Sequence, residues 1–548
     1  MDTSSESVSL AESSSHNGQV EVEIVEENNG TSCSNENEGC YDVTNENTSS
    51  EQKLTLWVVW SSLLALFSAY FMFGYSAASI NAIATPARKA FQEHHLVRYN
   101  TTLSEDDLNL IWTITVAAFP VGGILGCFIP NILVKKFGKL RSMLYGHVVV
   151  VIASVFLGLT SLLKSFEVIV IGRILIGVVT SSCSTSITPS YVVEVCSLKW
   201  RGMFGSTVMF FMSIGSFTST LLGLNEILGG DELWPMMLTL TGLPSLVFIF
   251  LFYFMPESPR HLYITERRKE EARKLLMKLR KCEDVSDELD KMETELQSQA
   301  SSKQMSLVQL FQSPALRFQL ITAMVLGSLF QLTGLNGLVA YLKQFYVAVG
   351  IPATDAQYAS LGPFATLLVV AVIPPFTIER VGRKKLLFIG YLIEGISLLL
   401  LTITIEIGHL AYWIPYLSIV FISGFLVGFA IGPGGITLLA VSEFFPQTSR
   451  TAALMTTSLC LWTSFTFVVV LFPYMIAAIR GFTFLIFSSI AFAVAVFVYF
   501  AVPEIKDRSF VEIQQIFKKK KFCCESRDSS NLSVQEISLE TPNMTSSA

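Results

Sequence analysis

The chain has 548 residues, of which 51% are hydrophobic and 15% are charged, and its formal net charge is −6. Soluble domains carry about 25% charged residues, so the composition excludes an ordinary soluble protein and indicates that lipid surrounds most of the chain. The nine cysteines show no disulfide or metal-ligand spacing. We expect no metal, no cofactor and no nucleic-acid partner.

The first 53 residues, rich in Ser, Asn and Glu, contain a single Lys or Arg. This composition is typical of segments that cannot bury a core, so residues 1–53 are expected to be a disordered acidic tail. The tail also places the first apolar run too far from the N-terminus for a cleaved signal peptide.

Twelve apolar runs follow the tail, and several exceed the roughly 20 residues that a membrane-spanning helix needs. They predict an all-α membrane protein with twelve transmembrane helices, six in residues 54–255 and six in residues 318–503. The runs lie near 54–80, 108–134, 142–163, 166–193, 202–228, 233–255, 318–346, 358–378, 386–405, 413–442, 451–479 and 481–502.

A polar insert, residues 256–317, separates the two sets of runs. Its apolar residues recur at helical spacing, which favours short amphipathic helices against the cytoplasmic face over a flexible linker. They are Ala272, Leu275, Leu276, Leu279, Leu289, Met292 and Leu296. Residues 504–548 are expected to form a cytoplasmic tail, in which we favour a solvated segment over palmitoylation of Cys523 and Cys524.

Lysines and arginines concentrate in the even-numbered connections between runs, which by the positive-inside rule places those connections and both termini in the cytoplasm. Arg88, Lys89 and Arg98, in the first connection, are exceptions. The same outer connection holds the sequon Asn100-Thr101-Thr102, so Asn100 is a candidate glycosylation site.

The chain also contains an internal repeat. The segments "KKFGKLR" (135–141) and "ERVGRKK" (379–385) place Gly138 and Gly382 244 residues apart (382 − 138), and Glu194 and Glu443 are 249 apart (443 − 194). Near-equal offsets indicate a duplicated six-helix unit. Two parallel halves of this kind are the architecture of a transporter whose site lies between them.

Charged residues at the cytoplasmic ends of the runs form matched sets. Charges at a membrane surface are costly unless they are solvated or paired, so we expect these residues to form a cytoplasmic gate that pairs across the halves. The alternative is that they are helix-end anchors that meet lipid headgroups. The carboxylates are Glu194, Glu257, Glu379, Glu443 and Glu504, and the cations are Lys136, Arg201, Arg260, Arg383 and Arg450.

Six segments resemble the sugar-porter signatures of the major facilitator superfamily. They are "GRILIG" (172–177), "PSYVVEVCSLKWRG" (189–202), "PESPRHL" (256–262), "QLTGLN" (331–336), "ERVGRKK" (379–385) and "GPGGITLLAVSEFFPQTSR" (432–450). Two others, "FGYSAASINA" (73–82) and "VPEIKDRSFVEI" (502–513), look like the animal facilitative glucose transporter branch. The resemblance covers residues 54–515 and implies twelve helices, alternating access and the cytoplasmic gate described above.

The resemblance also bears on energy coupling. Proton-coupled relatives place an Asp at the position of Ser76, so the resemblance favours uniport over proton symport. Glu394, in the ninth run, is an unusual acid for which we expect snorkelling or helix packing ahead of a proton relay.

The sugar contacts of the family, carried over by resemblance, are only partly retained. Gln331, Asn336 and Tyr341 remain, whereas apolar residues stand at other contact positions: Met209, Phe330, Leu367 and Leu438. A buried hydroxyl without a partner costs about 1–3 kcal/mol, and millimolar binding is worth only about 4 kcal/mol. The substrate is therefore left open.

The sequence predicts a facilitative carrier in the plasma membrane, a uniporter, for a hexose or related small polar solute, and the resemblance implies a monosaccharide. The alternatives are a carrier for a less hydroxylated solute and a non-transporting nutrient sensor with signalling tails. An enzyme is not expected, because no phosphate-binding loop or nucleophile motif appears. The oligomeric state is not predicted.

Overall fold

The computed structural model describes residues 54–301, 305–314, 316–505, 512–513 and 515–517. The acidic tail, residues 1–53, and Cys523 and Cys524 lie outside these residues. The described residues belong to one compact unit. Within the described residues every regular element is a helix.

Within the part of the chain that the structure describes, twelve helical segments are long and apolar enough to cross a membrane, and each overlaps one of the runs predicted from sequence. They are Leu56–Ala82, Glu105–Gly126, Lys139–Gly158, Glu167–Val195, Trp200–Leu222, Trp234–Phe254, Arg317–Ala340, Ala353–Ile378, Arg383–Leu410, Ile414–Phe444, Thr448–Ile479 and Phe482–Ala501. The prediction of an all-α protein with twelve spans is therefore confirmed.

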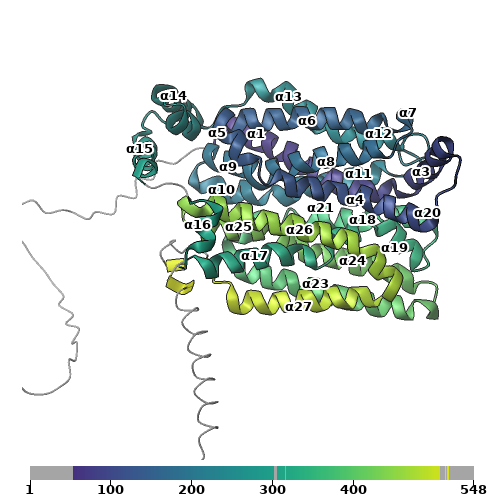
Figure 1. Ribbon diagram of the computed structural model, residues 1–548. Coiled ribbons are helices and arrows are strands. Elements are labelled where there is room, and N and C mark those ends of the chain that lie inside the picture. Colours follow the sequence, from purple (N-terminus) through teal and green to yellow (C-terminus); the bar gives the residue numbers. More distant parts are fainter. Residues whose placement is uncertain (1–53, 302–304, 315, 506–511, 514, 518–548) are drawn as a thin grey trace, which may run out of the picture. The chain divides into compact units, whose positions relative to one another are not determined.

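Spans one to six are called the N-terminal half here, and spans seven to twelve the C-terminal half. In Figure 1 the purple-to-blue helices of the N-terminal half gather in one group and the green-to-yellow helices of the C-terminal half in another. The halves meet where α4 (Glu105–Gly126) packs on α26 (Gln447–Ile479), and where α2 (Met72–Ala82) packs on α18 (Leu335–Ala340).

Several spans depart from regular α-helix. Spans one and four contain π-helical turns at Phe67–Phe71 and Cys183–Ile187. Span seven breaks at Gly334, with φ +90°, between α17 (Arg317–Leu332) and α18. Span ten breaks at Gly432, between α24 (Ile414–Ile431) and α25 (Pro433–Phe444). Such interruptions are frequent at functional positions.

Glycines allow α4 to approach α8 (Glu167–Ser182) within the N-terminal half. A side chain on Gly122 would overlap the carbonyl oxygen of Ile174, and one on Gly177 would overlap that of Phe119. The "GRILIG" segment thus supplies the close backbone contact that holds these two spans together.

The insert forms α14 (Lys269–Arg280), α15 (Ser286–Ser301) and α16 (Leu307–Gln312). Helix α14 buries Ala272, Leu276 and Leu279, as its periodicity predicts. It is fixed to the N-terminal half, because Thr55 Oγ1 donates to Leu279 O at 3.0 Å and Arg280 Nη1 donates to the carbonyl oxygen at position 195 at 2.7 Å. Helix α14 is therefore held against the N-terminal half, which favours the predicted amphipathic helices over a flexible linker.

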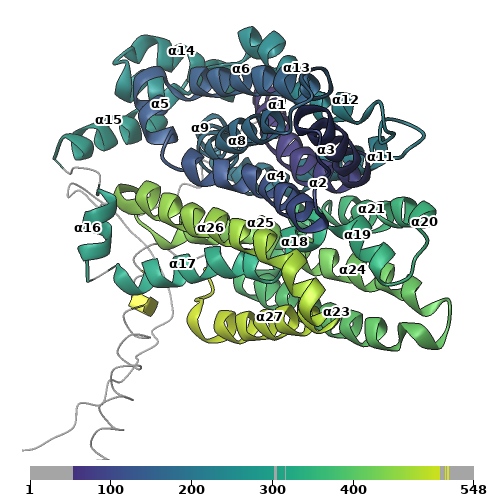
Figure 2. The same cartoon turned by 45° about the vertical axis from the view of Figure 1, so that its right-hand side comes forward.

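Helix α3 (Ala84–Tyr99), in the first connection, was not expected from the sequence. It lies at the end of the bundle away from α14 and α15 (Figures 1 and 2). Its basic residues have local partners: Arg88 donates to Asn109 Oδ1 at 2.8 Å, and Arg98 pairs with Glu167 at 2.9 Å. These contacts explain why the connection tolerates the cations that break the charge pattern.

Candidate functional site

An aromatic cluster fills the middle of the contact between the two halves. Trp462, on α26, has its ring centroid 5.7 Å from that of Phe73 on α2 and 5.7 Å from that of Phe119 on α4. Phe465, one turn further along α26, lies 6.1 Å from Phe119. The cluster therefore joins three spans from both halves, at the place where a transporter of this architecture would hold its solute.

Local sequence explains how Trp462 reaches this position. The side chain is 1% exposed, and its ring occupies the space beside Gly123, where any other residue would overlap it. Its indole Nε1 is buried without a hydrogen-bond partner. Sequence reasoning missed Trp462, because its place in an apolar run does not show whether the indole faces lipid or the other half.

The polar residues predicted to bind the solute lie at and after the break in span seven. Gln331 is fully buried, and its Oε1 accepts a hydrogen bond from Asn336 Nδ2 at 2.6 Å. The Gln331 Nε2 group has no hydrogen-bond partner. Tyr341 is buried and stacks on Phe472 with centroids 5.8 Å apart. One amide and one phenol are thus the polar groups that these residues still offer.

Three of the four predicted apolar contacts lie in or against the core cluster that contains Tyr341, and the fourth does not. Met209 and Leu367 are buried members of the same core cluster as Tyr341, and Phe330 packs against that cluster. Met209 crosses to the C-terminal half, because its sulfur lies beside Gly434. Leu438 is only half-buried and lies outside the cluster. The structure therefore brings most of the predicted contacts together and leaves Leu438 apart.

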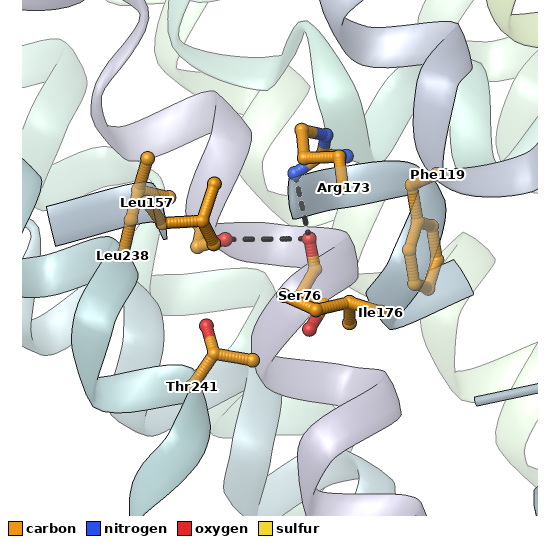
Figure 3. Close-up of a pocket in the computed structure, with 8 residues that line it drawn as sticks. Ser76, Phe119, Leu157, Arg173, Ile176, Leu238 and Thr241 are labelled. Atoms are coloured by element: carbon orange, nitrogen blue, oxygen red, sulfur yellow. Dashed lines mark hydrogen bonds between the residues drawn. The ribbon is translucent and has the colours of Figure 1, made fainter. Parts of the chain in front are cut away.

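A buried cation lies in the N-terminal half. The Arg173 side chain, on α8, donates through Nη1 to the Ser76 carbonyl at 3.4 Å and lies 5.5 Å from the Phe119 ring centroid, and its Nε has no partner. Thr241 lies near Ser76 and Arg173 in the same small polar group (Figure 3), which Ser79 also lines. Ser76 thus contacts the Arg173 guanidinium through its backbone carbonyl. Its side chain is a hydroxyl, whereas a carboxylate at this position could form an ion pair with Arg173.

Hydrogen bonds also join the halves at the end that carries α3. The backbone N–H of Lys343 donates to Asn81 Oδ1 at 2.8 Å, and the Tyr358 hydroxyl donates to Glu226 at 2.8 Å. At the insert end Asn131 Nδ2 lies 3.4 Å from Met455 Sδ across the same interface. The halves are therefore in contact near both ends as well as in the middle.

The predicted gate residues gather at the insert end. In the N-terminal half, Glu194 pairs with Lys139, lies 4.0 Å from Arg260 and accepts from the Ser258 hydroxyl. Arg260 also pairs with Glu295 of α15. The lysine that binds Glu194 most closely, Lys139, was missed because it is 55 residues away in sequence (194 − 139).

The C-terminal half repeats this arrangement. Arg383 Nη2 lies 3.3 Å from Glu443 Oε1, as Lys139 lies beside Glu194. Arg450 donates to the Phe445 carbonyl at 3.4 Å. Its counterpart Arg201 donates to the carbonyl of the residue five positions earlier, Cys196, at 3.3 Å. Each of these contacts joins residues of the same half.

Two further carboxylates cap helices in matching ways. Glu257 Oε1 accepts from the backbone N–H of Leu140 at 3.3 Å, near the start of α6 (Lys139–Gly158). Glu504 Oε1 accepts from the N–H of Arg383 at 3.1 Å, at the start of α23 (Arg383–Ile407). Both helices follow a glycine with positive φ, +81° at Gly138 and +94° at Gly382, which explains the glycine in both repeats.

The remaining predicted gate residues vary in position. Lys136 is exposed and lies 5.2 Å from the Phe137 ring centroid, and the side chain of Glu379 lies outside the described residues. Burial is the main cause that lowers the pKa of Arg260; Glu194 opposes this shift, and Arg450 of the other half adds to it. Cations of the two halves are thus close enough to repel each other.

No group of three His, Cys, Asp or Glu side chains that could hold a metal ion occurs in the part of the chain that the structure describes.

Comparison with protein families matches residues 61–517 to the family described as "Sugar (and other) transporter". The chain is 32% identical over 469 residues to solute carrier family 2, facilitated glucose transporter member 5, of Homo sapiens, which covers 86% of this chain and 93% of that protein. It is 33% identical over 472 residues to facilitated glucose transporter member 7 of Mus musculus, covering 86% and 92% of the two chains.

Solved structures share the fold. The proton:xylose symporter XylE bound to 6-bromo-6-deoxy-D-glucose, a major facilitator superfamily protein, superposes with a TM-score of 0.71 at 21% identity, over 84% of this chain and 99% of that one. The inward-open conformation of the xylose transporter XylE from E. coli gives a TM-score of 0.66 at 21% identity, over 84% and 100% of the two chains.

Proposed function

The chain belongs to the sugar transporter family, and from that premise we propose that it is a facilitative uniporter that moves a hexose or related small polar solute by alternating access. Its family and twelve spans make it a membrane transporter and not an enzyme. In the proposed arrangement two bundles, residues 54–255 and 318–503, move against each other and are joined by the insert, residues 256–317.

The observation that carries the proposal is the duplicated charge arrangement at the insert end. Lys139–Glu194 and Arg383–Glu443 occupy matching positions in the two halves, and each pair ties together helices of one half. Such pairs would keep each bundle rigid while the bundles rotate against each other. The nearby Arg260 and Arg450 supply like charges whose repulsion favours separation at this end.

We propose that pairing between the halves at this end, by Glu194, Glu443 and their neighbours, closes the cytoplasmic side during part of the cycle. Neutralising Glu443 (Glu443→Gln) should then favour the arrangement open to the cytoplasm. The readout is the labelling rate of engineered cysteines from that side. An unchanged rate would leave these residues as anchors of their own half.

Support for uniport comes from the surroundings of Ser76. Arg173 contacts the backbone carbonyl of this residue, and the Ser76 hydroxyl is itself without a partner. A carboxylate here could exchange a proton with solvent and form an ion pair with Arg173 when ionised, whereas serine cannot titrate. Ser76, at the position where proton-coupled relatives are expected to carry an acid, therefore supplies no group that could bind and release a proton during transport.

A second candidate, a carrier for a less hydroxylated solute, is favoured by the lining of the central interface. Met209, Phe330 and Leu367 offer no hydrogen bonds, and Trp462 and Gln331 each hold a buried donor without a partner. An unsatisfied buried donor costs about 1–3 kcal/mol, so a solute with a few well-placed acceptors would gain from both groups.

We place the insert end in the cytoplasm and the protein in the plasma membrane, with both termini cytoplasmic. The opposite end then faces outward and carries Asn100, which is exposed at the C-terminal end of α3. That position is open to N-glycosylation, and a mobility shift on glycosidase treatment that disappears in Asn100→Gln would test both the modification and the orientation.

The test of transport is uptake of labelled glucose, fructose and small polyols in cells that lack their own hexose carriers, with surface expression verified. Saturable uptake that falls in Arg201→Ala supports the carrier. Arg273→Ala is the matched control, because this arginine is exposed on α14 and its loss should leave uptake unchanged. Surface delivery without uptake of any solute would refute the hexose proposal and favour the less polar solute or the sensor.

A further inference from the structure

Glu394 is a carboxylic acid in the interior of the C-terminal half. It lies 11 residues after Arg383, where α23 begins (394 − 383), which corresponds to about 16 Å along the helix axis. That is close to the middle of a hydrocarbon layer about 30 Å thick. The residue is 0% exposed, so of the two roles expected for it, snorkelling and helix packing, the structure agrees with packing between helices.

The two oxygens of Glu394 are buried, and no hydrogen bond of good geometry reaches them. The polar group beside the carboxyl group is the Thr333 hydroxyl, and Tyr391 lies next to both Glu394 and the Thr437 hydroxyl. On the opposite side, the Cγ of Glu394 packs on Gly428 of α24. The carboxyl group is therefore enclosed by hydroxyls and backbone.

Among the described helices packed on α23, α22 (Pro374–Val381) carries Arg380, which precedes the start of α23 and lies 14 residues from Glu394 (394 − 380). His409 follows the other end of α23, so both charged positions lie at the ends of the helix and away from this carboxyl group. Helices α24 and α27 (Phe482–Ala501) contain no charged residue, and α25 carries Glu443 near its far end. The titratable neighbour of Glu394 is Tyr391, on the same helix. An ionised carboxylate in such surroundings costs several kcal/mol, so the arrangement seen here favours the protonated acid.

Thr333 lies between Glu394 and the break in span seven. It is the C-terminal cap of α17, and the next residue, Gly334, has φ +90° and starts α18. Helix α18 packs on α2 of the other half, and the Lys343 N–H to Asn81 bond lies just beyond it. Glu394 thus lies beside the joint between α17 and α18, and α18 contacts the other half.

We propose that Glu394 is a proton-binding site that controls the joint between α17 and α18. Protonated Glu394 allows the joint to pack on α23 without water between them, and it thereby holds α18 against α2. Loss of the proton draws water to the carboxylate and releases α18. This inference rests on the alternating-access function proposed above, with the proton acting as a regulator of the carrier.

The size of the effect follows from linkage between proton binding and conformation. If the acid binds its proton ten times more tightly in the closed arrangement, deprotonation shifts the ratio of open to closed protein by about tenfold. Transport would then depend on pH through one residue. Glu394→Gln, which resembles the protonated acid, should remove that dependence and hold the closed arrangement.

The test measures opening of α18 directly. Val339 lies on α18 and is 9% exposed, so Val339→Cys should react with a membrane-impermeant methanethiosulfonate reagent only when α18 leaves α2. The rate is measured in Val339→Cys alone and with Glu394→Gln added, from about pH 5.5 to about pH 8. The ratio of the two rates at each pH cancels the pH dependence of the thiol itself. Glu406→Gln is the matched control, because Glu406 is an exposed acid on the same helix.

We expect the ratio of the Val339→Cys rate to the double-variant rate to rise about tenfold with pH, and Glu406→Gln to follow the parent. A ratio that stays constant, or one that follows sodium concentration instead of pH, would overturn the proposal. The same holds if Glu406→Gln has the effect of Glu394→Gln. Labelling requires no solute, so a chain that opens with pH but takes up nothing would refute the transport function and leave the proton site standing.

Discussion

Replacing Trp462 by alanine should loosen the contact between the two halves. The indole makes two ring contacts across the interface, at 5.7 Å to Phe73 and at 5.7 Å to Phe119. Each aromatic pair contributes about 0.5–1.5 kcal/mol beyond its buried area, so the loss of both costs the contacting state about 1–3 kcal/mol. Since 1.4 kcal/mol corresponds to a tenfold change, the ratio of separated to contacting protein should rise about 5- to 150-fold.

Native thiols provide the assay. Cys460 lies on α26 two residues before Trp462, and Cys127 follows the end of α4, the span of the other half that packs on α26. Cys127 is buried and Cys460 partly so, so their alkylation by N-ethylmaleimide reports separation of the halves. Trp462→Ala should speed it in proportion to the shift, provided that opening and closing are fast compared with alkylation.

The matched control is Phe467→Ala on the same helix, whose side chain is 58% exposed and faces away from the other half. Alkylation in this variant should proceed at the parent rate. Equal rates in Trp462→Ala and the parent chain would refute the reasoning, and so would an equal increase in Phe467→Ala.

Three other substitutions test the fold around the site. Gly334→Ala should lower the melting temperature of the solubilised protein, because φ +90° costs a residue with a side chain about 1–2 kcal/mol and its Cβ would lie 2.7 Å from the Phe487 ring. Arg280→Ala breaks a pair that is 6% exposed on the arginine side, at a cost of about 3–5 kcal/mol; limited proteolysis between α14 and α15 should accelerate, but not in Arg273→Ala. Burial is the main cause that raises the pKa of Glu257 in the folded protein above its usual 4.5. The stability that this residue contributes is therefore present below pH 4.5 and is lost as the pH rises through the pKa of the folded protein. Glu257→Gln should flatten the plot of melting temperature against pH in this range, and an unchanged slope would contradict the assignment.

Sequence was sufficient to predict what depends on local pattern. The twelve spans follow from the length of the apolar runs, and the insert helices from the spacing of Ala272, Leu276 and Leu279, which the structure buries. The caps at Gly138 and Gly382 were recognisable as a repeat because each needs a backbone conformation that glycine adopts most easily.

Sequence was insufficient where a contact depends on how distant helices are rotated about their axes. It placed Glu194 at the correct end of the bundle but missed Lys139, since the partner is chosen by the angle between α6 and α9 (Thr188–Val195). It also missed Trp462, because an aromatic residue in an apolar run has the same composition whether it faces lipid or the other half.

The main-chain contacts at the insert end explain how the two halves drifted apart in sequence. Arg201 and Arg450 each bond to a carbonyl, so the residues that supply it, Cys196 and Phe445, have no side chain in common. Leu140 supplies a backbone N–H to Glu257 in the same way. After a duplication, such positions accept almost any residue except one that disturbs the backbone, while the charged member of each contact is held. The same type of hydrogen bond therefore accounts both for the difference between Cys196 and Phe445 and for the presence of an arginine at both 201 and 450.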